Sequence, residues 1–484
     1  MSGNAQKPVG STAPTTGTID TSNIQGDIIS QIPKKAQALF FYQIKDVQGF
    51  KQALAKFIPF IATETSVAKG RNDIAQHKNS GASGLLNLKF TTVSFSSKGL
   101  VKLGVKDDIN DASFTAGQLA DAQSLGDKGT TQNNVFEPDW LFPFKHDIHG
   151  LFSICGPSVQ IVQLELLAVL AHFHCTIREV YKVVGSVRPG AEDGHEHFGF
   201  NDGISNPALD GLSVGNPGDD TVDPGVVLLG RPGDNQPGTT TPVQRPSWAK
   251  DGTFLAFRLL NQLVPEFNNF LAANALKTSD PSVSGSDLLG ARLVGRWKSG
   301  APIMLTPTKD DPALGANTQK RNDFDYDLLS QVKCPFAAHI RKTYPRNDLG
   351  DESNDDPHRI IRRGIAFGPE VTPLEKASQK THFDRGLLFV SLQANLQQGF
   401  QFLQKNWANN ANFAFGKPQQ PGIDAIIGQV VSGNDNVGVR SLSGTNPADA
   451  TASLSLGTTE WIVPKGGEYF FVPSISALKG TIAA

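Results

Sequence analysis

Apolar and polar positions follow two kinds of pattern along this chain, and both patterns occur twice. Residues 38–44 form an apolar, aromatic-rich run typical of a strand, and an apolar stripe at helical spacing follows over residues 50–58. A similar run at residues 254–260 is followed by a similar stripe over residues 267–276. Because the order of strand and helix recurs, the pattern predicts two related halves that arose by internal duplication.

The remaining elements complete the two halves. Strands are predicted over residues 91–95, 178–187 and 386–392, and helices over residues 157–169 and 395–408. Strands and helices do not alternate regularly, which argues against a parallel sheet. The predicted fold class is therefore α+β, with antiparallel sheets covered by helices.

Composition divides the chain into four segments. Residues 1–18 are rich in Ser, Gly, Thr and Pro, which predicts a disordered arm. Residues 211–252 are dense in Gly, Pro, Asp and Thr, so they cannot form long regular elements and are expected to cross between two domains. Within them, the apolar run 226–229 is expected to be buried. We therefore expect an N-terminal domain at 19–210 and a C-terminal domain at 253–484.

The overall composition is that of an ordinary globular protein and disfavours two kinds of partner. Hydrophobic residues make up 39% of the chain and the formal net charge is -2, so no polybasic surface for nucleic acid is expected. No apolar run is long enough to cross a bilayer, so no membrane partner is expected. No basic-then-apolar signal peptide stands at the start, which leaves a cytoplasmic location open.

Two stretches concentrate candidate chemistry. The first runs from Cys334 to Glu370 and sets His339 among small apolar neighbours, with two clusters of arginines after it. A neutral imidazole that binds a metal beside anionic carboxylates would suit this pattern, and a core histidine with surface arginines suits it equally well. The second stretch, residues 194–207, contains the loop Gly199-Phe-Asn-Asp202-Gly203. An Asp-Gly pair by itself is a frequent turn.

Together the two stretches resemble the fungal type of dye-decolourising peroxidases, which are haem enzymes. The family is marked by a Gly-x-x-Asp-Gly loop and a distant proximal histidine. The resemblance runs from Asn23-Ile-Gln-Gly-Asp27 to Gly467-Glu-Tyr-Phe-Phe-Val-Pro473 and so covers nearly all of the chain. It implies two ferredoxin-like halves, with one haem b per chain bound in the C-terminal half, and an extracellular location. Because no Cys-x-x-Cys-His motif is present, the haem would be held noncovalently.

The resemblance assigns the residues on the proximal side of the haem. His339 would place its Nε2 on the iron, and Asp424 would orient the other ring nitrogen, making the imidazole more basic. By itself, Asp424 is as well explained as the N-cap of a helix that begins at Ala425. Arg346 and, less surely, Arg341 would meet the haem propionates, unless both form surface ion pairs.

The resemblance also assigns the distal side. Asp202 would move a proton from the iron-bound oxygen of peroxide to the leaving oxygen, and Arg362 would stabilise the negative charge that develops. Arg363 is the competing candidate for the distal arginine. A carboxylate stays basic in mildly acidic solution, where a histidine would be protonated, so the activity is expected to peak below neutral pH.

Further positions follow from the same resemblance. Ile204 and, on one strand, Leu387 and Phe389 would face the haem, although core packing is equally natural for the strand pair. Trp407 would be a surface relay for electrons from bulky donors, or else part of a core stripe at helical spacing. Phe367 stands where some relatives have a tyrosine, which excludes a tyrosyl route at that position.

These residues predict a peroxidase that reduces hydrogen peroxide and oxidises small and bulky aromatic donors, such as dyes and phenols. It would use one-electron steps through an oxoferryl intermediate. The alternatives are a haem-binding or iron-releasing protein on the same fold, and a binding module without haem. A zinc hydrolase is disfavoured, because His195 and His197 lack the His-Glu-x-x-His spacing and are better explained as loop residues that hydrogen-bond near the site.

Overall fold

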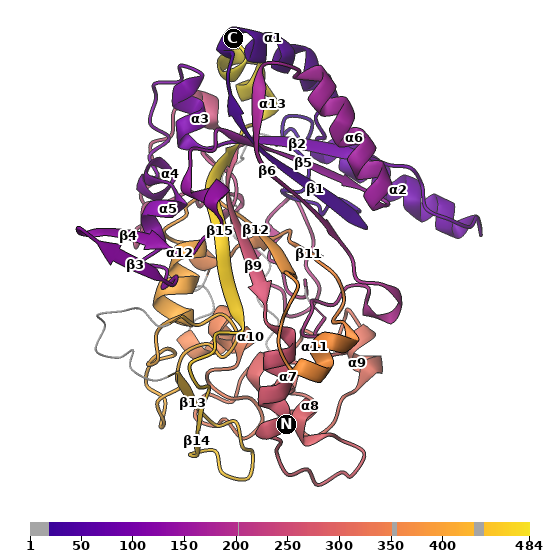
Figure 1. Ribbon diagram of the computed structural model, residues 1–484, viewed down its shortest axis with the longest axis vertical. Helices are drawn as coiled ribbons and strands as arrows, with labels where there is room; N and C mark the ends of the chain where they lie inside the picture. The colour runs from indigo at the N-terminus through magenta and orange to yellow at the C-terminus, as the bar shows by residue number, and fades with distance from the viewer. Residues whose placement is uncertain (1–18, 202, 351–355, 430–439) are drawn as a thin grey trace.

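A curved antiparallel sheet of nine strands organises the parts of the chain that the computed structural model describes, residues 19–201, 203–350, 356–429 and 440–484 (Figure 1). The hydrogen-bonded order is β10-β12-β9-β15-β2-β5-β1-β6, and β11 pairs with β12. The strands are β1 (Ala36–Ile44), β2 (Phe90–Phe95), β5 (Gly150–Gly156), β6 (Ile177–Ser186), β9 (Thr253–Gln262), β10 (Ile361–Arg362), β11 (Ile365–Phe367), β12 (Gly386–Gln393) and β15 (Ile462–Val472). The α+β class predicted from the sequence is confirmed.

Helices and short two-stranded ladders surround this sheet. The ladders pair β3 (Gly129–Gln132) with β4 (Val135–Pro138), β7 (Ala208–Leu209) with β8 (Thr221–Val222), and β13 (Ser441–Ser443) with β14 (Ser453–Ser455). The helices are α1 (Val47–Phe57), α2 (Glu64–Asn79), α3 (Ser97–Lys102), α4 (Ala112–Ala116), α5 (Gln118–Asp121), α6 (Val159–His172), α7 (Val264–Ala273), α8 (Gly285–Val294), α9 (Pro312–Ala316), α10 (His339–Thr343), α11 (Pro373–Ser378), α12 (Phe400–Phe402) and α13 (Ile475–Ala477). Among these helices, none is long and apolar enough to cross a membrane.

Both halves contribute to two apolar clusters, one on each face of β1. In the N-terminal half, Phe50 of α1 and Val162 of α6 pack against buried side chains on one face of β1 and β5. The opposite face of β1 meets strands of the C-terminal half, because Phe41 packs on Phe257 of β9 and Phe470 of β15, with ring centroids 4.8 and 6.1 Å apart. The sheet therefore curls around a core to which both halves contribute, and apolar burial on this scale is the main stabilising term.

The C-terminal end of the chain packs on the N-terminal half. After β15 the C-terminal residues return to the N-terminal half, where Lys51 Nζ of α1 donates to the carbonyl of Ala484 at 2.6 Å. Figure 1 shows the C-terminus beside α1, at the far end of the molecule from α7 and α8. Only one residue pair, Phe471 with Phe95, joins β15 to β2. The long strand β15 pairs with β2 on one side and with β9 on the other, and so joins the strands of the two halves in one sheet.

Most predicted elements are present, and their differences have local causes. The strands predicted over 38–44, 91–95, 178–187, 254–260 and 386–392 are β1, β2, β6, β9 and β12. In the predicted crossing at 211–252, the regular elements are the two-residue strand β8 and two short 3-10 helices, and residues 227–229 are fully buried. The helix predicted over 395–408 begins only at Phe400 and continues as a π-helix over Leu403–Ala408. The predicted arm at 1–18 lies outside the described residues.

Candidate active site

A cavity of about 240 Å³ lies among β9, β12, α8, α10 and the loop after His195. Its lining is mostly apolar and includes, from the residues singled out in the sequence, His339, Arg362, Arg346, Ile204, Leu387 and Phe389. These residues come from segments up to 185 positions apart, and only the fold brings them together. An apolar cavity with a few convergent polar groups is the usual form of a cofactor or substrate site.

His339 begins α10, and a buried carboxylate fixes its ring. The Nδ1 atom lies 2.8 Å from Oδ2 of Asp424, which is fully buried. The other oxygen, Oδ1, accepts the backbone N–H groups of Ile426 and Ile427 at 2.8 and 2.9 Å. Burial opposes ionisation, but His339, through its charge when the ring is protonated and through its hydrogen bond, holds the pKa of Asp424 below its ordinary value together with the backbone hydrogen bonds. A neutral ring that donates from Nδ1 keeps the lone pair on Nε2, which is the form a metal needs.

The Asp424→Asn variant tests this pairing. The amide keeps the shape and can still cap the turn at Ile426, but it removes the charge that makes the imidazole basic. We expect cofactor affinity or activity to fall about 10- to 100-fold, as for other outer partners of metal ligands. Cofactor titration and steady-state kinetics measure it, with Glu266→Gln as a control carboxylate that does not line the cavity. A variant with wild-type affinity and rate would contradict the assigned role.

The two adjacent arginines point to different places. Arg362 lines the cavity, its backbone N–H donates to Oδ1 of Asn206 at 2.9 Å, and its guanidinium donates to the Ile204 carbonyl at 2.7 Å. Arg363 is buried beside Asp27, away from the lining residues. The Arg363 side chain instead reaches the loop after Asp27, where it donates to the carbonyls of Asp27 and Ile29, and it does not line the cavity. The structure therefore favours Arg362 over Arg363.

The predicted acid/base Asp202 lies outside the described residues. Asn201 and Ile204, which flank it in the chain, both line the cavity.

The prediction for Arg341 is wrong. Its Nε and a terminal nitrogen bind both oxygens of the buried Asp348 at 2.6 and 2.8 Å, and it does not line the cavity. This two-point ion pair satisfies the guanidinium within the protein. Arg346 does line the cavity, together with Arg296 and Arg359, which the sequence reasoning missed.

The buried arginines fit an anionic cofactor. Arg296 and Arg346 donate to carbonyl groups and to Oδ1 of Asn322, and among the described residues no carboxylate lies within 4.0 Å of either. Arg346 Nε is buried with no hydrogen-bond partner there. Burial lowers the pKa of Arg296 to about 9. A negative charge bound nearby would stabilise the charged forms of Arg296 and Arg346. An imidazole ligand beside unneutralised guanidinium groups fits haem, which carries iron and two carboxylates.

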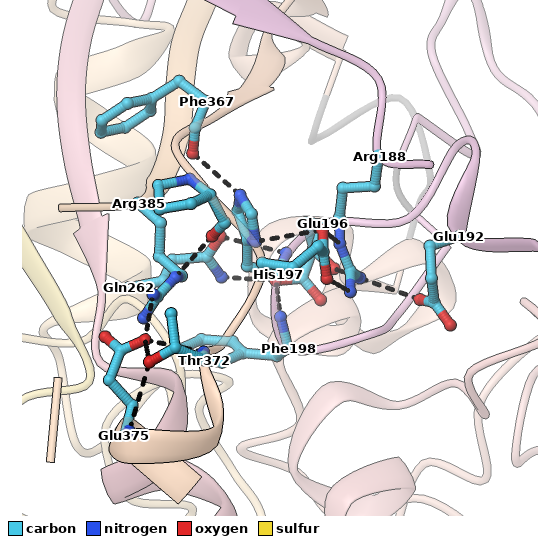
Figure 2. A network of polar contacts seen from close by, with 12 residues as sticks. Arg188, Glu192, Glu196, His197, Phe198, Gln262, Phe367, Thr372, Glu375 and Arg385 are labelled. Atoms are coloured by element: carbon cyan, nitrogen blue, oxygen red, sulfur yellow. Dashed lines mark hydrogen bonds and ion pairs between the residues drawn. The ribbon is translucent and has the colours of Figure 1, made fainter. Parts of the chain in front are cut away.

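The loop that precedes the Gly-x-x-Asp-Gly motif is fixed by Glu196, a cavity-lining residue that the sequence reasoning passed over (Figure 2). Its carboxylate accepts the backbone N–H groups of Phe198 and Phe200 at 2.8 and 2.9 Å and the side-chain amide of Gln262 on β9. Arg188 holds the Glu196 carbonyl at 2.7 Å. The distal loop is therefore fastened to the C-terminal half by hydrogen bonds.

His197 fastens the same loop to β11. Its Nε2 lies 2.8 Å from the Phe367 carbonyl, and the ring is almost fully buried (Figure 2). Burial lowers the pKa of His197 to about 4. Among the neighbouring charges, Arg188 and Arg385 also lower this pKa, whereas Glu370, whose Oε1 is 4.0 Å from Nδ1, raises it. His197 is thus a neutral residue, and it hydrogen-bonds beside the site, as we expected of a histidine in this loop.

This burial has a consequence for acid stability. An unfolded histidine has a pKa of about 6.5, so the unfolded chain binds a proton that the folded chain refuses until about pH 4. We therefore expect the free energy of unfolding to fall by on the order of 3 kcal/mol as the pH falls from about 6.5 to about 4. His197→Gln, which cannot gain the proton, should lack this component in urea unfolding at pH 7, 5.5 and 4. If the free energy of unfolding changed with pH to the same extent in both proteins, the predicted effect of His197 would be refuted.

Comparison with known proteins decides the family. A model described as "DyP dimeric alpha+beta barrel domain" matches residues 23–189, and one described as "Dyp-type peroxidase, C-terminal" matches residues 294–415. A dye-decolourising peroxidase of Exidia glandulosa is 44% identical over 477 residues, covering 96% of this chain and 88% of the relative. The chain belongs to the dye-decolourising peroxidase family. It is accordingly a peroxidase, as the sequence predicted.

Other dye-decolourising peroxidases agree. One from Auricularia auricula-judae is 43% identical over 492 residues, with 99% of this chain and 90% of the relative covered. A solved structure of a mutant from Pleurotus ostreatus has a TM-score of 0.90 at 47% identity, covering 96% of this chain and all of that one. A deferrochelatase of Shigella flexneri is 25% identical over 298 residues, 60% of this chain. The iron-releasing alternative is therefore not favoured.

Trp407 lies in the interior of this dye-decolourising peroxidase. Only 4% of its surface is exposed, and its ring stacks on Phe413 with centroids 4.9 Å apart. Its edge meets His358, a cavity-lining residue, at 5.3 Å. The prediction of a surface tryptophan is wrong, and the alternative of a core stripe is confirmed, because Leu403 packs in the same cluster. An electron relay through Trp407 would have to pass through neighbouring side chains.

Proposed function

We propose that this peroxidase holds one noncovalent haem b per chain in the cavity beside His339 and Arg362 and uses it to reduce hydrogen peroxide. The observation that carries the proposal is the combination of a carboxylate-held imidazole and unneutralised buried guanidinium groups around one apolar cavity. The described cysteines Cys155 and Cys334 are buried, and none of the three forms a disulfide or lines the cavity, which fits noncovalent binding. When bound, the haem supplies the redox chemistry of peroxide cleavage and donor oxidation.

Each of the site residues has a defined role in this proposal. His339 would hold the iron through Nε2, and Asp424 would keep the proton on Nδ1 and the ring in one orientation. Arg346 and Arg296 neutralise the propionates. Arg362, permanently charged, stabilises negative charge on the peroxide oxygen that leaves. Asp202 would accept the proton of the bound peroxide and return it to the leaving oxygen, so that water departs.

Aromatic donors fit the remaining lining. Phe389, Phe400 and Leu387 give the cavity an apolar wall that suits an aromatic ring. A 42%-identical relative has been solved in complex with 2,6-dimethoxyphenol, with a TM-score of 0.84. We propose that small phenols reach this cavity and that bulkier dyes give up electrons from outside it, through intervening residues.

The absorption spectrum of haem-loaded protein, before and after one equivalent of hydrogen peroxide, tests the proposed function. We expect a Soret band that shifts within milliseconds and returns when a phenol is added. A stable Soret band that ignores peroxide would favour a haem-carrying role instead. Failure to take up haem at all would refute the proposed cofactor site.

A further inference from the structure

The backbone beside Arg362 is not held by a continuous strand. β10 ends at Arg362 and β11 begins only at Ile365, so two residues between them lie outside the regular ladder. The Arg363 N–H still donates to the Val390 carbonyl at 2.8 Å. The Arg363 carbonyl, however, accepts a hydrogen bond at 2.7 Å from Nζ of Lys34, a residue of the N-terminal half. The peptide group that follows Arg363 is thus held by a side chain more than 300 positions away.

The Arg363 side chain reaches the same part of the N-terminal half. Its Nε donates to the Asp27 carbonyl at 2.7 Å and lies 3.4 Å from the Asp27 carboxylate. A terminal nitrogen donates to the carbonyls of Ile28 and Ile29 at 3.4 and 3.1 Å. Lys34 Nζ completes the cluster, 3.7 Å from the same carboxylate. We call Asp27, Lys34 and Arg363 the Arg363 anchor.

The loop that receives the anchor is itself firmly held. The buried carboxylate of Glu64 accepts the backbone N–H groups of Ile28, Ile29 and Ser30 at 2.8 to 2.9 Å. The Asp27 carboxylate accepts the N–H of Ile32 at 2.7 Å. Both ion-pair partners of Asp27 are nearly inaccessible, with 4% of the Lys34 side chain and 5% of the Arg363 side chain exposed. Buried charges in such a network define a geometry more than they add stability.

We propose that Lys34 and Arg363 are positioning residues for the peroxide step, because they set the place of Arg362 from the N-terminal loop. Asn206 accepts the backbone N–H of Arg362 and the Ile204 carbonyl accepts its guanidinium, so Arg362 also has supports that are independent of the Arg363 anchor. A displacement of about 1 Å in a reacting group can cost about 100-fold in rate. This role would also give the Asn23–Asp27 segment a function through Asp27, although none of its residues lines the cavity. The inference rests on the role proposed above for Arg362.

A double-mutant cycle on the full-length, haem-loaded protein tests the proposal. The variants are Lys34→Met, Arg362→Leu and the two combined. The readouts are the second-order rate constant for reaction with hydrogen peroxide and the melting temperature of the protein without haem. We expect Lys34→Met to slow the reaction about tenfold in the wild-type background and to have no further effect once Arg362 is replaced. It should lower the melting temperature equally in both backgrounds.

Controls separate positioning from general damage. Lys35→Met removes the neighbouring lysine, which forms a half-exposed pair with Asp193, and should leave the rate unchanged. Lys34→Arg should restore most of the rate, because a second cation can still reach the Arg363 carbonyl. Asp27→Asn, which keeps an oxygen for the Ile32 N–H, provides the same cycle if Lys34→Met does not fold.

Each outcome decides between the two proposals. An equal slowing by Lys34→Met in both backgrounds would show that the anchor acts on stability or cofactor binding, and would overturn the positioning role. A slow Arg362→Leu variant combined with an unchanged Lys34→Met rate would also overturn it, while leaving the function of Arg362 intact. An unchanged rate in Arg362→Leu would instead refute the role of Arg362 itself and with it the premise of the anchor.

Discussion

Replacing Arg362 by leucine is expected to slow the reaction with hydrogen peroxide by about 10²- to 10³-fold, while haem stays bound. Leucine fills similar space but removes the permanent charge that faces the developing negative charge, and one preorganised donor of this kind contributes about that much. Stopped-flow mixing with peroxide measures the effect directly. Arg178→Leu, which removes an exposed arginine of β6, should leave the rate unchanged.

A second substitution at the same position separates charge from geometry. Arg362→Lys keeps the positive charge but loses the planar group that donates to the Ile204 carbonyl at 2.7 Å. If charge alone matters, the lysine variant should recover most of the lost rate. If the fixed orientation matters as well, recovery should be partial. A leucine variant within threefold of wild type would mean that Arg362 has no part in peroxide cleavage.

Three central strands of this fold were predictable because they are rich in apolar residues. β1, β9 and β12 contain seven, six and five apolar residues, most of them consecutive, which identifies them without any knowledge of their partners. The two-residue strand β10 has no such signal, because it exists only through its pairing with β12. The same limit applies to the segment 395–408. Its apolar spacing correctly predicted burial, but spacing does not decide between α and π hydrogen bonding.

The site was less accessible to sequence reasoning than the fold. The contact between His339 and Asp424 joins residues 85 positions apart, and only the family resemblance indicated it. Among the arginines, the sequence offered one usable signal that was missed, since Asp348 lies seven residues after Arg341 and neutralises it. Nothing local distinguishes Arg296 or Arg359 from surface arginines. Their approach to the cavity depends on tertiary packing alone.

Replacing His339 by alanine is expected to have the largest effect of any single change at this site. Loss of an outer partner of a metal ligand costs about 10- to 100-fold, so loss of the ligand itself should exceed about 100-fold in cofactor affinity and in peroxidase activity. Haem titration followed by the Soret band measures the affinity. Added imidazole should restore part of the binding in a His339→Gly variant, because it can replace the missing ring.

His358 supplies a matched control for this prediction. It is a second histidine in the cavity lining, and burial lowers its pKa. Its Nδ1 faces the Gln398 carbonyl at 2.7 Å rather than a carboxylate, and its ring stacks on Phe402. A ring without a carboxylate partner is the weaker metal ligand, so His358→Ala should keep the haem. If His358→Ala lost the haem and His339→Ala kept it, the pairing of His339 with Asp424 would be a structural contact, and the cofactor would have to be bound through His358.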